Sequence, residues 1–328
     1  MSASPLLQLR GLSTHYVSAR GTRVVRAVDD VSLTLGAGET LGVVGESGSG
    51  KTTLALTILR LLPPAARIVA GQLLFEGEDL LAKSDAEMRR IRGKRIAMIL
   101  QDPMASLNPL FTIGDQIAEP IRVHERTKRA SAWDRARELL RAVKIPAAES
   151  RLRDYPHQLS GGMRQRIVGA IAISCGPRLL IADEPTTSLD VTIQAQYLKL
   201  LRELQRQHGL ALIFITHNLG IVAKMCDQVA VMYAGRLIES GPVHQIFDAP
   251  AHPYTRALLE SIPRMGDADR RLTAIDGQPP DLADPPGGCA FHPRCPKMVD
   301  RCRREEPPAF DIAADQVARC WLAAPAGR

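Results

Sequence analysis

The sequence predicts an α/β protein built on a largely parallel β-sheet. Strand-like apolar runs at 95–100, 178–182, 210–215 and 227–233 are separated in several places by helical patterns. Such alternation is typical of a parallel sheet covered by helices. One further apolar run, at 39–45, leads into a glycine-rich segment that opens a helical pattern. The chain has 328 residues, which allows about two domains.

The first part of the chain predicts strands and one helix. Residues 6–44 favour strands of an edge sheet. Residues 51–62 predict a helix with Leu54, Ile58 and Leu61 on one face. This helix directly follows the glycine-rich segment, so its N-terminus is available to a ligand.

The middle and the end of the chain differ in pattern. Residues 71–75 predict another strand and residues 191–207 a helix, whereas 113–172 have helical periodicity and no convincing strand. We therefore expect a helical insertion within the α/β domain. Residues 276–296 hold six prolines and three glycines, which excludes regular helix and central strand. The C-terminal tail is expected to be rich in loops.

The composition is that of a folded globular protein. Hydrophobic residues make up 45% and charged residues 23%, which excludes wholesale disorder. Aromatic residues are only 4%, so neither a base-stacking surface nor a nucleic-acid partner is expected. The net charge of +7 permits contact with nucleotide or with an anionic membrane surface and selects neither.

No segment has the pattern of a targeting signal or a membrane span. The first residues, MSASPLLQLR, lack a charged region followed by a long apolar stretch. The longest stretch without Asp, Glu, Lys or Arg, at 207–223, contains the polar residues His208 and Asn218. We therefore expect a cytoplasmic protein that contacts the membrane through partners.

The glycine-rich segment reads GESGSGKT and fits the pattern G-x-x-x-x-G-K-[ST]. Its glycines let backbone N–H groups converge on phosphate oxygens, and the helix N-terminus adds partial positive charge. Lys51 can reach the β- and γ-phosphates, and the Thr52 hydroxyl can ligate Mg²⁺. The predicted nucleotide ligands are Gly45, Glu46, Ser47, Gly48, Ser49, Gly50, Lys51, Thr52 and Thr53.

Polar residues follow three of the predicted strands. Asp183, after the apolar residues 179–182, would hold Mg²⁺, and Glu184 would orient and polarise the attacking water. His217 follows another strand and could contact the γ-phosphate. Gln101 ends a further strand. For His217 and Gln101, an ordinary structural position at a strand end is the alternative interpretation.

A second glycine-lined helix start occurs at Ser160, Gly161 and Gly162, before the helical run at 165–174. It presents a hydroxyl and bare N–H groups to an anion. A serine N-cap followed by flexible glycines is the alternative interpretation. The two helix starts make sense together if ATP is held between two chains.

These motifs resemble, in their order, the ATPase subunits of ABC transporters. They are GESGSGKT, Gln101, LSGGM, LLIADE, Ser188-Leu189-Asp190 and His217. The resemblance covers about residues 5–262. It implies a P-loop (RecA-like) ABC nucleotide-binding domain, here 1–262, with an antiparallel β subdomain and a helical subdomain at about 104–175. Residues 263–328 would then form a loop-rich extension with a cysteine motif.

The resemblance also implies roles for individual residues. Gln101 would lie in the loop that couples the ATP site to the membrane subunits and would complete the Mg²⁺ coordination. Together with Glu184 and His217 it would act in catalysis. Tyr16 would stack on adenine, with His15 as the less favoured alternative.

The remaining motifs are implied to act between two cassettes. Ser160, Gly161 and Gly162, followed by Met163, would contact the nucleotide held by the opposite cassette. Met163 stands where many ABC proteins carry Gln, and we expect little effect from this difference. Asp190 would link the two sites across the interface.

Three segments resemble the dipeptide/oligopeptide importer subfamily, which also includes nickel importers. They are QDPMASLNPLF at 101–111, HPYTRALL at 252–259 and the cysteine-bearing tail. The resemblance implies a peripheral ATPase at the cytoplasmic face of the bacterial inner membrane. Its partners would be a second, homologous ATPase subunit, two transmembrane permease subunits and, indirectly, an extracytoplasmic substrate-binding protein.

Two other functions remain open at this point. A nickel or other solute importer of the same subfamily is the alternative to a peptide importer, because nothing in an ATPase subunit contacts the substrate. A soluble ABC ATPase that acts on nucleic acid or ribosomes fits the positive charge. Such proteins usually carry two fused cassettes or a long coiled coil, and this chain has one cassette and no sustained heptads.

The tail carries four cysteines: Cys289, Cys295, Cys302 and Cys320. Four thiolates suit tetrahedral Zn²⁺ or an iron–sulfur cluster, and the absence of close C-x-x-C pairs disfavours zinc. The resemblance to peptide-importer ATPases implies a [4Fe–4S] cluster, with Zn²⁺ or unliganded thiols as alternatives. His292 is another candidate ligand, whereas Cys175 and Cys226 are expected in the core.

Overall fold

The computed structural model describes residues 4–102, 106–187, 189–262 and 275–324. Ser188, residues 103–105 of the segment 101–111, and the beginning of the predicted extension at 263–274 lie outside the described residues. Within the described ranges, no helix combines the length and the apolar character needed to cross a bilayer.

The chain divides into two compact units. Unit 1 is made of Met1–Leu81 and Phe214–Arg328, and unit 2 is Ala82–Ile213. Strand β8 (Ala211–Ile215) contains the boundary between them. Unit 1 contains the glycine-rich loop and the cysteine-bearing tail. Unit 2 contains the LSGGM motif and the carboxylates of Asp183 and Glu184.

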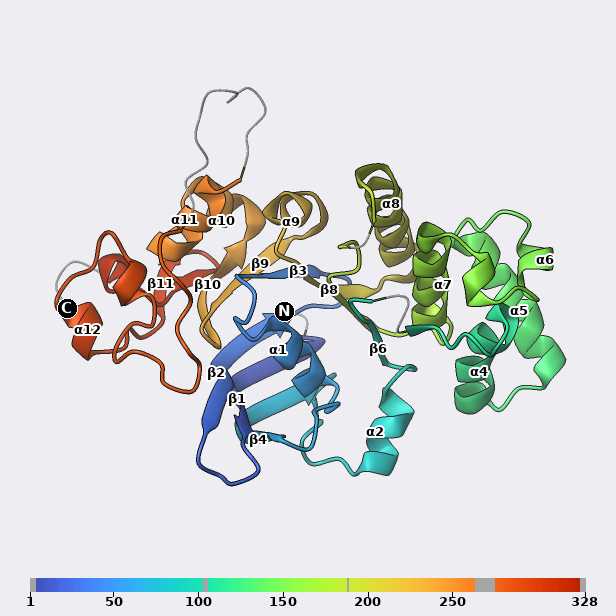
Figure 1. Ribbon diagram of the computed structural model, residues 1–328, viewed down its shortest axis with the longest axis horizontal. Helices are drawn as coiled ribbons and strands as arrows, with labels where there is room; N and C mark the ends of the chain where they lie inside the picture. The colour runs from blue at the N-terminus through green and yellow to red at the C-terminus, as the bar shows by residue number, and fades with distance from the viewer. Residues whose placement is uncertain (1–3, 103–105, 188, 263–274, 325–328) are drawn as a thin grey trace. The chain divides into compact units, whose positions relative to one another are not determined.

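Unit 1 contains a four-stranded antiparallel sheet in the order β2-β1-β4-β5 (Figure 1). Leu7, Leu9 and Leu12 on its central strand are at most 1% exposed and anchor it to the core. The sheet confirms the predicted antiparallel β subdomain, although β4 begins at Ala66 rather than at residue 71. The strands are β1 (Leu7–Val17), β2 (Val24–Leu35), β4 (Ala66–Phe75) and β5 (Glu78–Asp79).

Unit 1 also contains a strand series in the order β11-β12-β10-β9-β3. β3 and β9 pair in parallel, and every residue of β3 is buried, as expected for a strand covered on both faces. The prediction of a loop-rich tail misses a hairpin, because β11 and β12 continue this sheet antiparallel to β10. The strands are β3 (Thr40–Val44), β9 (Gln228–Tyr233), β10 (Arg236–Pro242), β11 (Phe310–Ala313) and β12 (Gln316–Ala318).

Helix α1 (Lys51–Ile58) is shorter than predicted. Leu54 and Ile58 are buried, but Leu61 lies beyond the helix and is 47% exposed, so its predicted place on the apolar face is wrong. Arg60 has φ 50, and the Leu61 N–H donates to the Leu56 carbonyl oxygen at 2.9 Å. A left-handed residue with this bond ends the helix in a Schellman-type turn.

The other helical segments of unit 1 lie in its C-terminal half (Figure 1). α11 begins after an N-cap at His252, whose Nδ1 accepts from the Tyr254 N–H at 3.0 Å. The segments are α9 (Leu219–Met225), α10 (Val243–Asp248), α11 (Pro253–Glu260), α12 (Arg301–Arg304), and the 3₁₀ turns η2 (His292–Arg294) and η3 (Trp321–Ala323).

Unit 2 joins a parallel strand pair to a group of helices (Figure 1). Ala118, Ile121 and Ala132 form a small core between α4 and α5. The helices confirm the predicted insertion at 113–172. The elements are α2 (Asp85–Ile91), β6 (Ile96–Ile99), α4 (Ile113–Glu125), α5 (Arg129–Ala142), α6 (Ala148–Arg151), η1 (Pro156–Gln158), α7 (Gly161–Ile173), β7 (Leu179–Asp183) and α8 (Val191–His208).

Candidate nucleotide site

The glycine-rich loop connects β3 to α1 in unit 1. Gly45 has φ +150, and a Cβ there would lie 2.2 Å from the Met232 carbonyl oxygen. Gly50 has φ +102, and its Cβ would lie 2.0 Å from the Ala27 carbonyl oxygen. Both positions require glycine because the neighbouring backbone approaches too closely for a side chain.

Lys51 begins α1 and is only 6% exposed. Its Nζ donates to the Gly45 oxygen at 2.8 Å, to the Glu46 oxygen at 2.9 Å and to Ser49 Oγ at 3.3 Å. The ammonium therefore lies against the loop at the N-terminus of α1, where backbone N–H groups and the helix dipole favour an anion. Thr52 follows in an exposed position.

The two candidate adenine contacts have different surroundings. Tyr16 Oη lies 3.3 Å from Thr53 Oγ1, so β1 places this ring beside the first turn of α1. His15 Nε2 lies 3.9 Å from Asp29 Oδ1. Of the two candidates, it is therefore Tyr16 whose hydroxyl lies next to Thr53, one of the residues predicted to bind nucleotide.

In unit 2 the ends of two strands bring Gln101 and Glu184 together. Asp183 ends β7 with 2% of its surface exposed, and Glu184 follows with φ 45. The Glu184 carboxylate accepts from Gln101 Nε2 at 3.3 Å and from Thr187 Oγ1 at 2.9 Å. A left-handed backbone at a non-glycine residue is strained, and such strain is concentrated at functional sites.

The LSGGM motif begins helix α7. Ser160 is its N-cap, and the Ser160 hydroxyl accepts from the Met163 N–H at 3.4 Å. A Cβ on Gly162 would lie 2.7 Å from Ile193 Cγ2, whereas a Cβ on Gly161 would meet no atom within 4 Å among the described residues. Packing inside the chain therefore explains the glycine at 162, and the described structure provides no such reason at 161.

Two further predicted residues flank helices. Asp190 is the N-cap of α8 and accepts from the Ile193 N–H at 2.9 Å, a structural role that the sequence analysis did not predict. His217 is exposed after β8, between the buried Thr216 and Asn218, the N-cap of α9. Asp190 belongs to unit 2 and His217 to unit 1.

The four tail cysteines interact with one another in unit 1. Burial raises the pKa of Cys289 to about 11, and Cys302, Cys320 and Cys295 add to this electrostatically. Cys302 and Cys320 are 7% and 6% exposed. Nevertheless, no group of three or more His, Cys, Asp or Glu in the described part of the chain is arranged to hold a metal ion. The predicted metal site is therefore not shown.

The other predicted thiol and imidazole side chains have contacts within unit 1 or unit 2. Cys226 packs against the core cluster that contains Val222 and Tyr233, as expected. Cys175 is half-buried after α7, where its Sγ accepts from Ser174 Oγ at 3.8 Å. The ring of His292 contacts the Cys289 carbonyl oxygen through Nδ1 at 3.0 Å.

The sequence analysis missed two contacts from the C-terminal half to the glycine-rich loop. Tyr254 Oη accepts from the Glu46 N–H at 2.9 Å. Arg294 donates from Nη1 and Nη2 to the Glu46 carboxylate, at 2.7 and 3.1 Å. The partners are 208 and 248 residues apart, so no local pattern could have revealed them.

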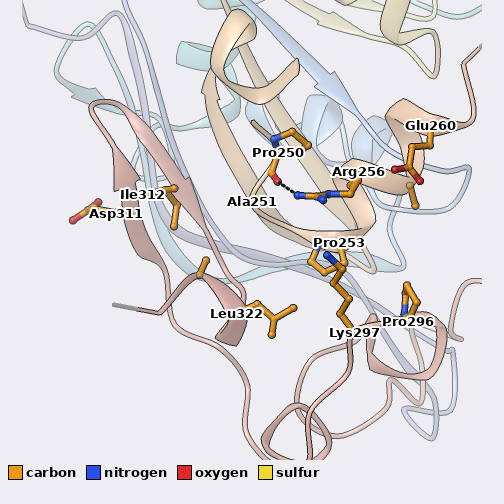
Figure 2. A pocket seen from close by; sticks show the side chains of 12 residues that line it. Pro250, Ala251, Pro253, Arg256, Glu260, Pro296, Lys297, Asp311, Ile312 and Leu322 are labelled. Atoms are coloured by element: carbon orange, nitrogen blue, oxygen red, sulfur yellow. Dashed lines mark hydrogen bonds between the residues drawn. The ribbon is translucent and has the colours of Figure 1, made fainter. Parts of the chain in front are cut away.

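A cavity of about 850 Å³ lies beside α11 and the cysteine-bearing segment (Figure 2). On one side, Arg256 donates to the Pro250 carbonyl oxygen at 3.3 Å. Pro296, Lys297 and residues of the C-terminal end complete its wall. The described lining residues include none of the predicted nucleotide ligands, so the cavity is separate from the loop.

Comparison with known proteins identifies the family. Residues 28–187 match the ABC transporter family, and residues 238–302 match the oligopeptide/dipeptide transporter C-terminal region. The dipeptide transport ATP-binding protein DppD of Escherichia coli is 48% identical over 315 residues, which is 96% of each chain. The chain belongs to the ABC transporter family. This ABC ATPase is also 46% identical, over 321 residues and 98% of each chain, to the oligopeptide transport ATP-binding protein OppD of Haemophilus influenzae.

Solved structures agree with this assignment. The ABC ATPase resembles a dimeric ATP-binding cassette in a post-hydrolysis state, bound to ADP and Pi, with a TM-score of 0.64 and 25% identity. The match covers 72% of this chain and 98% of that one. The predicted family, the ABC ATPase fold and ATP hydrolysis as the activity are confirmed by these comparisons.

Proposed function

We propose that this ABC ATPase energises the import of dipeptides or oligopeptides across the cytoplasmic membrane. The observation that carries the proposal is the similarity of residues 238–302 to the oligopeptide/dipeptide transporter C-terminal region. The named dipeptide and oligopeptide transport relatives, which match over nearly the full length, support it. The ATPase would act as a peripheral subunit at the cytoplasmic face of the membrane.

The proposed assembly contains four subunits and a delivery protein. Two cassettes, this one and a homologous partner, close on two ATP molecules, and their closure rearranges two transmembrane permease subunits. An extracytoplasmic binding protein supplies the substrate. The dimeric arrangement of the similar cassette that holds ADP and Pi supports the pairing.

ATP binding is assigned to the glycine-rich loop. Lys51 and the loop N–H groups would hold the phosphates, and Tyr16 would stack on adenine beside Thr53. Thr52, Asp183 and Gln101 offer the oxygen ligands that Mg²⁺ prefers, and a bound Mg²⁺ supplies charge neutralisation at the phosphates.

Hydrolysis is assigned to Glu184 in unit 2. Its carboxylate would orient and polarise the attacking water, and Gln101 and Thr187 already hold that carboxylate in place. His217 would steady the γ-phosphate. The left-handed backbone of Glu184 supports this role, because backbone strain of this kind is concentrated at active sites.

The LSGGM motif is assigned to the nucleotide of the opposite cassette. Ser160, Gly161 and Gly162 would present a hydroxyl and N–H groups to its phosphates, with Met163 behind them. The open surroundings of Gly161 support this role. Asp190 would connect the two sites across the interface.

The C-terminal residues 263–328 are proposed as an extension that follows the ABC ATPase domain at 1–262, whose helical subdomain spans about 104–175. The four interacting thiols suit a [4Fe–4S] cluster, with Zn²⁺ as the alternative, because a bound cation would stabilise thiolates that burial disfavours. Cys289, Cys295, Cys302 and Cys320 would be its ligands. Such a group would cross-link the loop-rich segment and thereby stabilise its fold.

The test is to co-purify the ATPase with its permease subunits and binding protein and to identify the bound ligand by mass spectrometry. Dipeptides or oligopeptides are expected. Bound nickel with no peptide would instead assign a metal importer of the same subfamily. Association with ribosomes or nucleic acid, without permease subunits, would contradict the importer function altogether.

A further inference from the structure

Glu46, the second residue of the glycine-rich loop, forms a bidentate ion pair with Arg294 of the C-terminal extension. Nη1 and Nη2 donate to its two carboxylate oxygens at 2.7 and 3.1 Å. The Arg294 side chain is only 5% exposed and that of Glu46 26%. Bidentate charge-assisted pairs fix both position and orientation, and burial limits their screening by salt.

Arg294 is itself held on several sides. Its Nε donates to the Asp276 carbonyl oxygen at 2.8 Å, and Nη1 contacts Tyr233 Oη at 3.3 Å. The guanidinium carbon lies 5.9 Å from the ring centroid of Tyr233 and 6.0 Å from that of Phe291. The side chain therefore has one orientation, which points it at the loop.

Tyr254 holds the same loop residue from helix α11. Its hydroxyl accepts from the Glu46 N–H at 2.9 Å, and the residue is fully buried. Its ring centroid is 4.6 Å from that of Tyr233 and 5.3 Å from that of Phe291. Aromatic contacts of this geometry are rigid, so the N–H of Glu46 is tied to a fixed point.

The carbonyl oxygen of Glu46 completes the connection. It accepts from Lys51 Nζ at 2.9 Å and from the Ser49 N–H at 3.2 Å. A single residue thus joins the C-terminal extension to the lysine that binds phosphate. We propose that Arg294 and Tyr254 are positioning residues for ATP, which order the glycine-rich loop through Glu46 and thereby raise its affinity for Mg-ATP. Ordering a loop before the ligand binds removes part of the entropic cost of binding.

The test compares Arg294→Gln and Arg294→Lys in the assembled importer. Arg294→Gln is expected to raise the KM for ATP and the Kd for a non-hydrolysable Mg-ATP analogue about tenfold, the cost of one charge-assisted pair. The kcat should stay within about twofold, because no group at the reacting atoms changes. Arg294→Lys should bind ATP more tightly than Arg294→Gln and less tightly than the wild type. It keeps the positive charge but cannot form the bidentate pair with Glu46.

The matched control is Lys297→Gln, which removes an equal charge three residues later, at the exposed wall of the cavity in Figure 2. The KM of this variant for ATP should equal that of the wild type. In a double-mutant cycle, Glu46→Gln with Arg294→Gln should bind ATP no more weakly than the weaker single variant. Additive losses, or a fall in kcat at unchanged KM, would overturn the proposal.

Tyr254→Phe keeps the test decisive even if Arg294→Gln does not fold. It preserves the aromatic packing and removes only the acceptor for the Glu46 N–H. A Kd about three- to tenfold higher is expected, with a melting temperature lowered by no more than a few degrees, because one hydrogen bond is lost. Unchanged nucleotide affinity in both Tyr254→Phe and Glu46→Gln would refute the positioning role.

Discussion

The side-chain amide of Gln101 lies 3.3 Å from the carboxylate of Glu184. The contact follows from the parallel pairing of β6 and β7, in which Ile99 is opposite Ala182. Each of the two residues lies two positions beyond its paired strand residue, so the sheet aligns them at the same edge. A residue expected to couple the ATP site to the membrane subunits is thus in contact with the proposed catalytic carboxylate.

Replacing Glu184 by Gln should abolish turnover without abolishing ATP binding. The amide cannot polarise water as a carboxylate does, and general-base catalysis contributes about 10²- to 10⁴-fold in rate. Steady-state phosphate release should fall by at least about a hundredfold while the Kd for Mg-ATP stays unchanged. Normal turnover in this variant would remove Glu184 from the catalytic role.

Gly161→Ala and Gly162→Ala should separate function from folding. A Cβ at 161 has open space, so the melting temperature should be unchanged or slightly raised, because Ala favours helix over Gly. ATPase activity should nevertheless fall about tenfold or more, because the added methyl group would enter the open space in which the partner's nucleotide is proposed to bind. Differential scanning fluorimetry and phosphate release measure the two effects.

Gly162→Ala is the contrasting variant. Its Cβ would lie 2.7 Å from Ile193 Cγ2, and overpacking of this kind costs about 1–3 kcal/mol. Both stability and activity should therefore decrease. Full activity of Gly161→Ala, in either cassette of the pair, would argue against nucleotide contact by this motif.

His252 should make the stability of unit 1 depend on pH. Burial lowers the pKa of His252 to about 3, whereas in the unfolded chain it is about 6.5. Below pH 6.5 the unfolded chain therefore binds a proton that the folded chain does not, and stability decreases as the pH falls toward 3. From pH 7 to pH 5 this residue alone should lower the free energy of unfolding by about 2 kcal/mol.

Denaturant unfolding of His252→Asn at the two pH values checks this contribution. Asn keeps an N-cap acceptor for the Tyr254 N–H and does not titrate. The variant should lose about 2 kcal/mol less than the wild type between pH 7 and pH 5. Exposed His208, at the end of α8, provides the control, and His208→Asn should behave as the wild type does. Equal pH dependence in all three proteins would disprove the assignment.

Cys302→Ser tests the proposed [4Fe–4S] cluster of the tail, because it removes one of the four proposed ligands. Anaerobically purified wild type is expected to contain about four iron and about four acid-labile sulfide per chain. The variant should lose both and should melt at a lower temperature, because the loop-rich tail loses its staple. Cys175→Ser, outside the tail, should retain both. Zinc without acid-labile sulfide in the wild type would contradict the cluster and would show that the tail binds Zn²⁺ instead.

The sequence predicted most of the fold because the decisive signals are local. The apolar runs, the glycine-rich loop and the helical periodicity at 113–172 each identify an element without reference to the rest of the chain. The hairpin of β11 and β12 was missed because most of Phe310–Ala313 is exposed and shows no alternation. Its place is set by pairing with β10, which is distant in sequence.

The same limit applies to the site. Lys51, Asp183 and Glu184 are predicted from motifs, whereas the contacts of Tyr254 and Arg294 with the loop depend on tertiary packing. Leu61 was misplaced because the helix ends in a left-handed turn at Arg60 that apolar spacing does not reveal.

The most direct test of the central claim is peptide uptake by the purified importer in proteoliposomes. The binding protein and labelled dipeptide are supplied on the side of the membrane opposite to the ATPase. With Mg-ATP on the ATPase side, the account predicts uptake and phosphate release that rise together and that both disappear with Glu184→Gln. Uptake that continues in Glu184→Gln, or ATP hydrolysis that never moves peptide, would contradict it.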